Sequence, residues 1–83
     1  MKRGFRINPN DNVAIVLEAV EPGEQVQIED ICVVAHQSVP MLHKMALEDI
    51  PLGQSVKKFG SSIGEASCDI AKGDHVHLHN LVN

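Results

Sequence analysis

A ten-residue pattern that occurs three times places the strongest constraint on how this chain folds. The segments 17–26, 47–56 and 67–76 align, and each contains a glycine that is followed three positions later by a valine. Glycine supplies the positive φ that short hairpin loops require. Because the three glycines (Gly23, Gly53 and Gly73) are unequally spaced, the pattern indicates three similar hairpins in one compact module and not a solenoid.

Short β-branched and apolar runs between turn-forming residues predict strands rather than helices. The strands that we expect cover residues 13–17, 25–28, 31–35, 55–59, 62–70 and 75–81. The segment 43–50 could be a strand or one helical turn, because Pro40 suits the first position of such a turn. Asp49 and Asp69 are expected to accept hydrogen bonds from the amides of their own turns. The sequence therefore predicts an all-β fold in a single domain, residues 1–83.

Size and charge exclude several classes of function. The 83 residues allow one domain with a thin core, and aliphatic side chains must fill it because Phe5 and Phe59 are the only aromatic residues. The net charge is −4 and aromatic residues make up 2% of the chain. Proteins that bind nucleic acid need a basic face or stacking platforms. We therefore expect no nucleic acid as a partner.

Nothing in the chain predicts a membrane or secreted protein. The longest apolar runs, 13–17 and 31–35, fall far short of the roughly 20 residues that span a bilayer. The basic start at residues 1–6 is followed by polar residues and not by the apolar segment of a signal peptide. Cys32 and Cys68 do not make a disulfide framework, and their apolar or small neighbours predict two buried thiols. We expect a cytoplasmic protein with no membrane partner.

The histidines carry the chemical information in this sequence. His75, His77 and His79 follow one another at intervals of two residues. On a strand their imidazoles would project from one face, while Val76 and Leu78 would anchor the other. Imidazoles in this register can share a divalent metal or bind an anionic ligand. The alternative is the exposed polar face of an edge strand.

Other polar residues extend this candidate site. Asn80 is an oxygen donor close to the three histidines in sequence. His43 and Lys44 stand together at a predicted strand start, where the pair could clamp a carboxylate or a sugar hydroxyl. The alternative for that pair is a solvated strand start. We expect His36 at the surface or in a capping position, and Lys57-Lys58 at a solvated strand edge.

Blocks of residues spaced along the chain resemble the SAF domain of the family that contains altronate dehydratases, galactarate dehydratases and sulfolactate sulfo-lyases. The resemblance covers about residues 7–81. The blocks that carry it, in chain order, are residues 11–14, 43–53, 56–60, 63–66, 69–73 and 75–80. One departure is Leu42, which stands where the family usually has a glycine before the His-Lys pair.

The resemblance implies a small β-clip fold and a part in eliminating water from a six-carbon sugar acid, which gives a 2-keto-3-deoxy acid. It also implies a divalent metal, iron(II) with manganese as a second choice, in the complete enzyme. The metal ligands that we predict are His75, His77 and His79. The predicted catalytic residues are His75 and His77, and the predicted substrate-binding residues are His43, Lys44 and Asn80.

Size limits what the chain can do alone. Such a dehydration needs a base for the proton α to the carboxylate, a Lewis acid for the enediolate and an acid for the departing hydroxyl. A thin module can hardly enclose a sugar acid and supply all three. We therefore expect a small subunit or excised domain that assembles with a larger catalytic subunit or domain, with a homo-oligomer as a further assembly. The competing hypotheses are a non-catalytic carbohydrate- or metal-binding β-clip module, a sulfolactate sulfo-lyase small subunit, and a nickel or zinc carrier.

Overall fold

The computed structural model describes residues 1–83 and contains strands, turns and loops without a helix. The strands are β1 (Lys2–Phe5), β2 (Val13–Val16), β3 (Gln25–Ile28), β4 (Ile31–Val34), β5 (Lys44–Ala46), β6 (Ser55–Lys58), β7 (Ser61–Ala66), β8 (His75–Val76) and β9 (Leu81–Val82). The all-β prediction is confirmed, and segment 43–50 holds a strand rather than a helical turn. No helix has the length and apolar character needed to cross a membrane.

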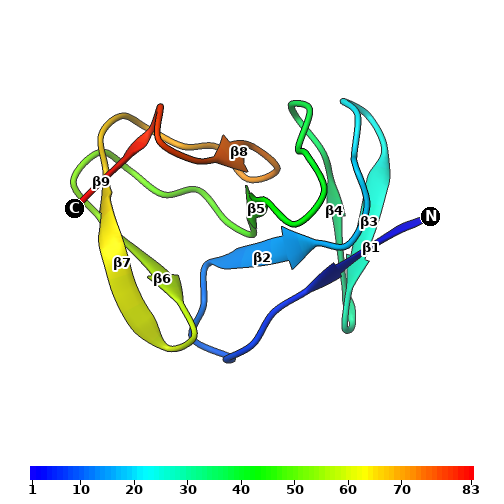
Figure 1. The fold of residues 1–83 in the computed structure, drawn as a ribbon, viewed down its shortest axis with the longest axis horizontal. Helices are drawn as coiled ribbons and strands as arrows, with labels where there is room; N and C mark the ends of the chain where they lie inside the picture. Colours follow the sequence, from blue (N-terminus) through cyan, green and yellow to red (C-terminus); the bar gives the residue numbers. More distant parts are fainter.

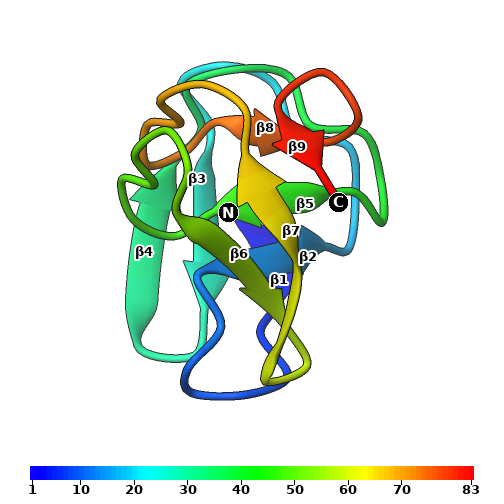
Figure 2. The same ribbon diagram turned by 90° about the vertical axis from the view of Figure 1, so that its left-hand side faces the viewer.

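The strands form two sheets that lie side by side (Figure 1). The larger sheet has the order β4-β3-β1-β2-β5-β8, and the smaller one has the order β6-β7-β9. Neighbouring strands are antiparallel except for β1 and β3, which are parallel. Figure 2 looks onto the small sheet, with the strands of the larger sheet behind it. The sequence did not predict β1, which is the strand that joins β3 to β2.

Two aliphatic clusters make up the core. The first draws on β2, β3, β4 and β5 and includes Val26, Ile28 and Met45. The second joins the larger sheet to the smaller one and includes Val56 and Ile70. Neither cluster contains an aromatic side chain, as the composition requires, and both phenylalanines are half-exposed. The core is therefore thin and divided, and apolar packing alone places few constraints on how the two sheets meet.

Four turns of one design join the strands, and they cover residues 20–24, 39–43, 50–54 and 70–74. The fourth residue of each turn has a φ between 67° and 91° and donates its amide to the carbonyl of a neighbouring segment. Three of these residues are Gly23, Gly53 and Gly73, which confirms the positive φ predicted for them. The remaining one is Leu42, whose Cβ makes this backbone conformation strained.

The prediction that the turns with Gly23, Gly53 and Gly73 close hairpins is wrong. The strands on either side of each turn are not paired with each other. The turns pair with one another instead, through antiparallel bridges between Val20 and Val39 and between Ile50 and Ile70. Pairing between distant turns leaves no local mark in the sequence. The three hairpins of the fold lie elsewhere, between β1 and β2, between β3 and β4 and between β6 and β7.

Two aspartates connect the second pair of turns. Asp49 accepts a hydrogen bond from the amide of Lys72 at 2.9 Å, and Asp69 accepts one from the amide of Leu52 at 2.9 Å. The expectation that each aspartate binds its own turn is therefore wrong. Each carboxylate instead binds the turn that the other precedes, so the two turns support each other.

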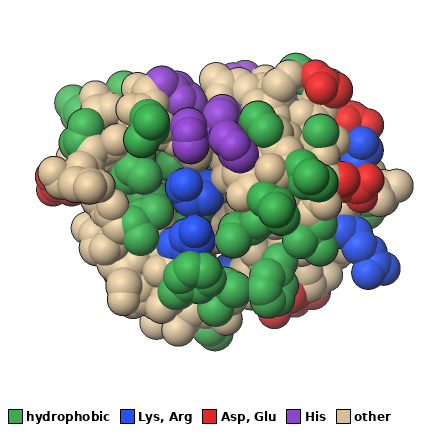
Figure 3. Space-filling model, in the orientation of Figure 1, with side chains coloured by type: hydrophobic (Ala, Val, Ile, Leu, Met, Phe, Trp, Pro, Cys, Tyr) green, Lys and Arg blue, Asp and Glu red, His purple; other side chains and the backbone are tan.

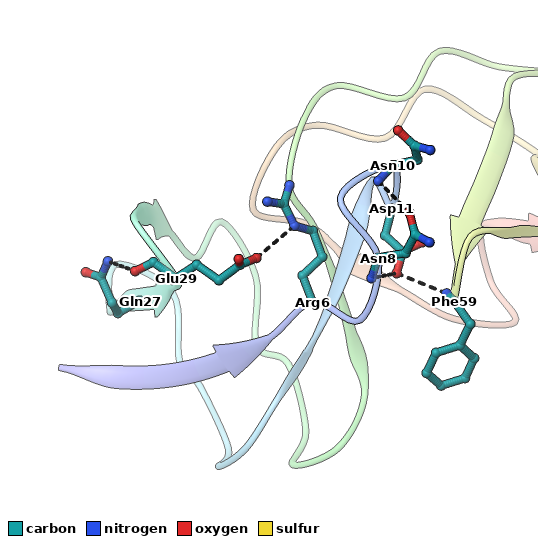
Figure 4. A network of polar contacts seen from close by, with 7 residues as sticks. All are labelled: Arg6, Asn8, Asn10, Asp11, Gln27, Glu29 and Phe59. Atoms are coloured by element: carbon teal, nitrogen blue, oxygen red, sulfur yellow. Dashed lines mark hydrogen bonds and ion pairs between the residues drawn. The ribbon is translucent and has the colours of Figure 1, made fainter.

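Two buried polar side chains connect the larger sheet to the β6–β7 hairpin. Asp11 accepts hydrogen bonds from the amides of Phe59 and Gly60, at 3.0 and 2.7 Å, and from the amide of Asn8 (Figure 4). The side chain of Asn12 donates to the carbonyl of Ser55 and accepts from the amide of Lys57. Because hydrogen bonds are directional, these contacts define where the hairpin sits.

The prediction of two buried thiols is wrong, because both cysteines are exposed. Cys32 lies on β4, where Val33 takes the inward position and the alternation of a strand turns Cys32 outward. Cys68 lies in the bend after β7, ahead of the turn at residues 70–74. Short apolar runs do not reveal which of their members faces the core.

Substitutions at the fourth residue of these turns should change the free energy of unfolding in opposite directions, depending on whether glycine is introduced or removed. Replacing Leu42 by Gly should stabilise the protein by about 0.5 to 1 kcal/mol. Glycine relieves the strain of the positive φ, and the leucine side chain that is removed is exposed, so little packing is lost. Gly53→Ala should destabilise by about 1 kcal/mol, since open space surrounds it and only the backbone is strained. Gly73→Ala should cost more, because its Cβ would press against the carbonyl oxygen of Val34. Urea unfolding measures all three, and an equal cost at Gly53 and Gly73 would contradict this account.

Asp11 should make the stability depend on pH. Burial raises its pKa, but the amides of Gly60, Asn8 and Phe59 outweigh burial and lower the pKa below 3.8. A carboxylate with a lowered native pKa contributes stability that is present above the unfolded pKa and is lost as the pH falls through the native pKa. Asp11→Asn should therefore destabilise by about 1 to 3 kcal/mol at pH 7 and by less at pH 3.

Urea unfolding at both pH values measures this effect. The same change at Asp30, which is exposed in the β3–β4 loop, is the matched control and should leave the free energy of unfolding at pH 7 almost unchanged. An Asp11→Asn penalty that is equally large at pH 3 would contradict the role of the carboxylate charge.

Candidate functional site

The segment that carries three of the histidines is not one strand. After His75 and Val76 the chain leaves β8 and turns over residues 77–80 before β9 begins. Leu78, which was expected to anchor the strand in the core, is 81% exposed at this turn. The expectation of a continuous strand over residues 75–81 is therefore wrong, although the strict alternation in sequence favoured it.

Asn80 is the physical reason for this turn. Its side-chain oxygen accepts a hydrogen bond from the amide of His77 at 2.9 Å, and its side-chain nitrogen donates to the carbonyl of His75 at 2.8 Å. Asn80 is only 4% exposed. Both polar ends of its side chain thus bind the backbone, which makes Asn80 the residue that shapes the loop beneath the imidazoles.

The imidazoles nevertheless gather, because β5 and β8 are paired. Lys44 lies opposite Val76 in this pair, so the residue before Lys44 meets the residue after Val76. These two residues are His43 and His77, and their ring centroids are 4.5 Å apart. His75 completes the group: its Nε2 lies 2.9 Å from Nδ1 of His43, and its ring stacks on that of His77. All three side chains are half-buried.

The structure brings together a different set of three histidines from the set predicted as metal ligands. Ring nitrogens of His43, His75 and His77 all lie within 4.8 Å of one another. His79 lies outside this group; it is exposed, with its ring centroid 5.2 Å from that of His75. His36 lies at the surface, as expected, and pairs with Asp74. His43, His75 and His77 together form the histidine group.

The electrostatic surroundings of the histidine group are positive. Loss of hydration, followed by the charge of His43 and the other histidines, lowers the pKa of His75 to about 4. Loss of hydration and then the charge of Lys58 lower the pKa of Lys44. Loss of hydration, followed by the charges of His43, Lys44 and His79, also lowers the pKa of His77. No carboxylate acts on any of these groups, so His75 is a neutral imidazole at physiological pH.

The histidine group fits a divalent transition metal. Two nitrogens that bind one ion at about 2.1 Å lie roughly 3 Å apart, and His43 and His75 already present nitrogens at 2.9 Å. Imidazole is a ligand for zinc, copper, iron and nickel. Three protein ligands leave coordination positions open, as in catalytic sites and not as in closed structural sites. The site can thus hold a metal and still accept a further ligand.

Sequence reasoning missed one basic residue whose charge acts on Lys44. Lys58 was expected at a solvated strand edge, but it is half-buried, and its ammonium lies 4.8 Å from the ring centroid of Phe59. Figure 3 shows the histidines with basic side chains directly below them and apolar side chains on either side. The weak signal in the sequence is strand alternation, which places Lys58 on the side of β6 that the buried Val56 occupies.

Comparison with known proteins finds relatives along nearly the whole chain. The family model of the altronate/galactarate dehydratase SAF domain matches residues 2–83. Two altronate dehydratases, from Escherichia coli K12 and Bacillus subtilis 168, are 44% identical over 76 residues and 35% identical over 80 residues. The alignments cover 92% and 96% of this chain but only 15% and 16% of those proteins.

A shorter relative aligns over most of both chains. The (2R)-sulfolactate sulfo-lyase subunit alpha of Chromohalobacter salexigens is 30% identical over 73 residues, which is 81% of this chain and 78% of that protein. The alignments thus cover a small part of the dehydratases and most of the sulfo-lyase subunit.

The histidine group should bind one divalent ion per chain. Titration calorimetry with Zn²⁺ as the probe should show that His43→Gln and His77→Gln lower the affinity about tenfold or more. His79→Gln should change it less than about threefold, and His36→Gln should leave it unchanged, because neither imidazole belongs to the group. If His79→Gln lowers the affinity about tenfold and His43→Gln leaves it unchanged, the set His75, His77 and His79 is the correct one.

Proposed function

The chain belongs to the altronate/galactarate dehydratase SAF domain family, and we propose that it is the small subunit or amino-terminal domain of an altronate dehydratase-like hydro-lyase. In this role it helps to eliminate water from a hexonate to give a 2-keto-3-deoxy acid, in a site that a larger catalytic domain or subunit completes. The observation that carries the proposal is the histidine group, which is only half-buried and has no carboxylate among the charges that act on it. Such a site is incomplete without further groups.

The residues of this chain have distinct parts in the proposed reaction. His43, His75 and His77 would hold a divalent metal, iron(II) or manganese, which supplies Lewis acidity toward the hexonate when bound. Lys44 would bind the carboxylate of the substrate by its charge. His79 lies outside the histidine group and is exposed, so its imidazole is free to carry a proton to the departing hydroxyl. The base that removes the α-proton is left to the partner.

Apolar side chains beside the histidine group support a partner that covers it. Leu42 precedes His43 and is 62% exposed, and Leu78 follows His77 and is 81% exposed. Leu42 also holds a strained backbone where the three equivalent turns have glycine. Exposed apolar groups at a strained position bring no stability to the isolated domain, but they suit a surface that a second protein buries. The sulfolactate sulfo-lyase relatives are themselves named as subunit alpha.

A sulfolactate sulfo-lyase small subunit is the second candidate function. It is supported by a relative of this kind that is 30% identical over 73 residues. The dehydratase is favoured by identity, which is 44% against 30%. A substrate panel that contains several hexonates and (2R)-sulfolactate separates the two candidates.

The test is reconstitution with the cognate large chain. His77→Ala should lower hexonate turnover about tenfold or more, because a metal ligand or acid–base group is lost. The thermal unfolding midpoint of the small chain should change little, since a half-buried imidazole contributes little to packing. The 2-keto-3-deoxy product measures turnover.

The controls of this experiment address the remaining histidines. His36 lies outside the histidine group, so the enzyme reconstituted with the His36→Gln variant should retain full turnover. If His77→Ala and His79→Ala both retain full turnover with the large chain present, the histidines form only a polar surface and the proposal fails. Turnover by the small chain alone would contradict the need for a partner.

A further inference from the structure

We infer that Lys44 and Lys58 together form a binding site for a small anion, next to the histidine group, and that the anion is the carboxylate of a polyhydroxy acid. The existence of the anion site does not depend on the proposed function, whereas the choice of a polyhydroxy acid rests on it.

The two lysines come from different sheets, which share the second aliphatic cluster. Lys44 lies on β5 of the larger sheet, where it pairs with Ile15 of β2. Lys58 ends β6 of the smaller sheet. Ala46 of β5 and Val56 of β6 belong to the same aliphatic cluster. Strand alternation places Lys44 and Lys58 on the sides of their strands that these two residues occupy, and there the charge of Lys58 acts on Lys44. Figure 3 shows basic side chains below the histidines in the middle of this face, while acidic side chains lie toward its edges.

Neither lysine has a counter-charge within the protein. The ion pairs of the structure are made by Lys2, Arg6 and His36. Lys44 and Lys58 are half-buried and are left without a carboxylate partner. Like charges that are partly removed from water destabilise each other, and a bound anion removes that penalty. An uncompensated pair of ammonium groups is therefore a feature that a ligand explains and the fold alone does not.

The position of Lys58 is built into the fold. Its ammonium lies 4.8 Å from the ring centroid of Phe59, within the range of a cation–π contact. Phe59 has a φ of 58°, and Asp11 binds its amide, so the hairpin loop that carries the ring is held to the larger sheet. The neighbouring Lys57 is exposed and lacks such a contact. Lys57 is thus a matched control of the same charge in the same strand.

The surroundings limit the size of the anion. Lys44 is flanked across the sheet by Ile15, which pairs in turn with the half-exposed Phe5. An apolar border around two ammonium groups suits a small ligand with one anionic end. It does not suit a nucleic acid or a lipid surface, which needs an extended set of basic residues, and the whole chain carries a net charge of −4.

The experiment uses the whole 83-residue chain, labelled with ¹⁵N, without added metal and at constant ionic strength. The probe is D-gluconate, and the matched ligand is sorbitol, which has the same six-carbon polyol skeleton but no carboxylate. We expect gluconate to shift the amide signals of Lys44, Lys58 and Phe59 in a saturable way, and sorbitol to leave them unchanged. Lys58→Gln should weaken gluconate binding about three- to fivefold, as expected for one partly exposed ion pair, and Lys57→Gln less than about 1.5-fold.

Two results would overturn the inference. Equal shifts with gluconate and sorbitol would show that the carboxylate is not recognised. Equal weakening by Lys57→Gln and Lys58→Gln would show that only the general surface charge matters. Since neither metal nor the large chain is present, this outcome is independent of the reconstitution assay. If gluconate does not bind but the reconstituted enzyme turns over hexonate and needs His77, only this inference fails. If gluconate binds but His77→Ala and His79→Ala leave the reconstituted enzyme fully active, only the proposed function fails.

Discussion

The contact between Asp11 and the loop of the β6–β7 hairpin is the interaction on which the rest of the structure depends. The two aliphatic clusters are small, and burial of apolar surface is not directional. The aspartate and the neighbouring Asn12 supply the direction that the core lacks. The candidate site needs this contact as well, because the larger sheet carries His43 and Lys44 while the smaller one carries Lys58. A movement of one sheet against the other would separate these residues.

Features determined by neighbours in the chain could be predicted from the sequence. Gly23, Gly53 and Gly73 have the expected backbone conformation because glycine tolerates a positive φ that other residues avoid. Most strands also lie where short β-branched runs are found. Features determined by distant segments could not be predicted. The strand β1 has no alternating apolar pattern of its own, and it forms because β2 and β3 lie on either side of it.

In the candidate site, too, local features could be predicted from the sequence and contacts between distant segments could not. The sequence indicated that the histidines matter, and the structure brings His75 and His77 together with His43, which was expected to bind substrate instead. Two distant effects decided this arrangement. The pairing of β5 with β8 brings His43 to the group, and the side chain of Asn80 ends the strand before His79 can line up with the others.

The exchanged bonds of Asp49 and Asp69 have a consequence for the folding kinetics of the domain. Each of the two turns lacks one of its hydrogen bonds until the other turn has arrived, so neither is a complete local nucleus. The intervening chain must close first, at an entropic cost that comes before any gain. A fold built from such distant pairings has a high contact order, and folding on the scale of milliseconds to seconds is typical of that class. The carboxyl-terminal half of the domain should then acquire its turns in one cooperative step rather than one after another.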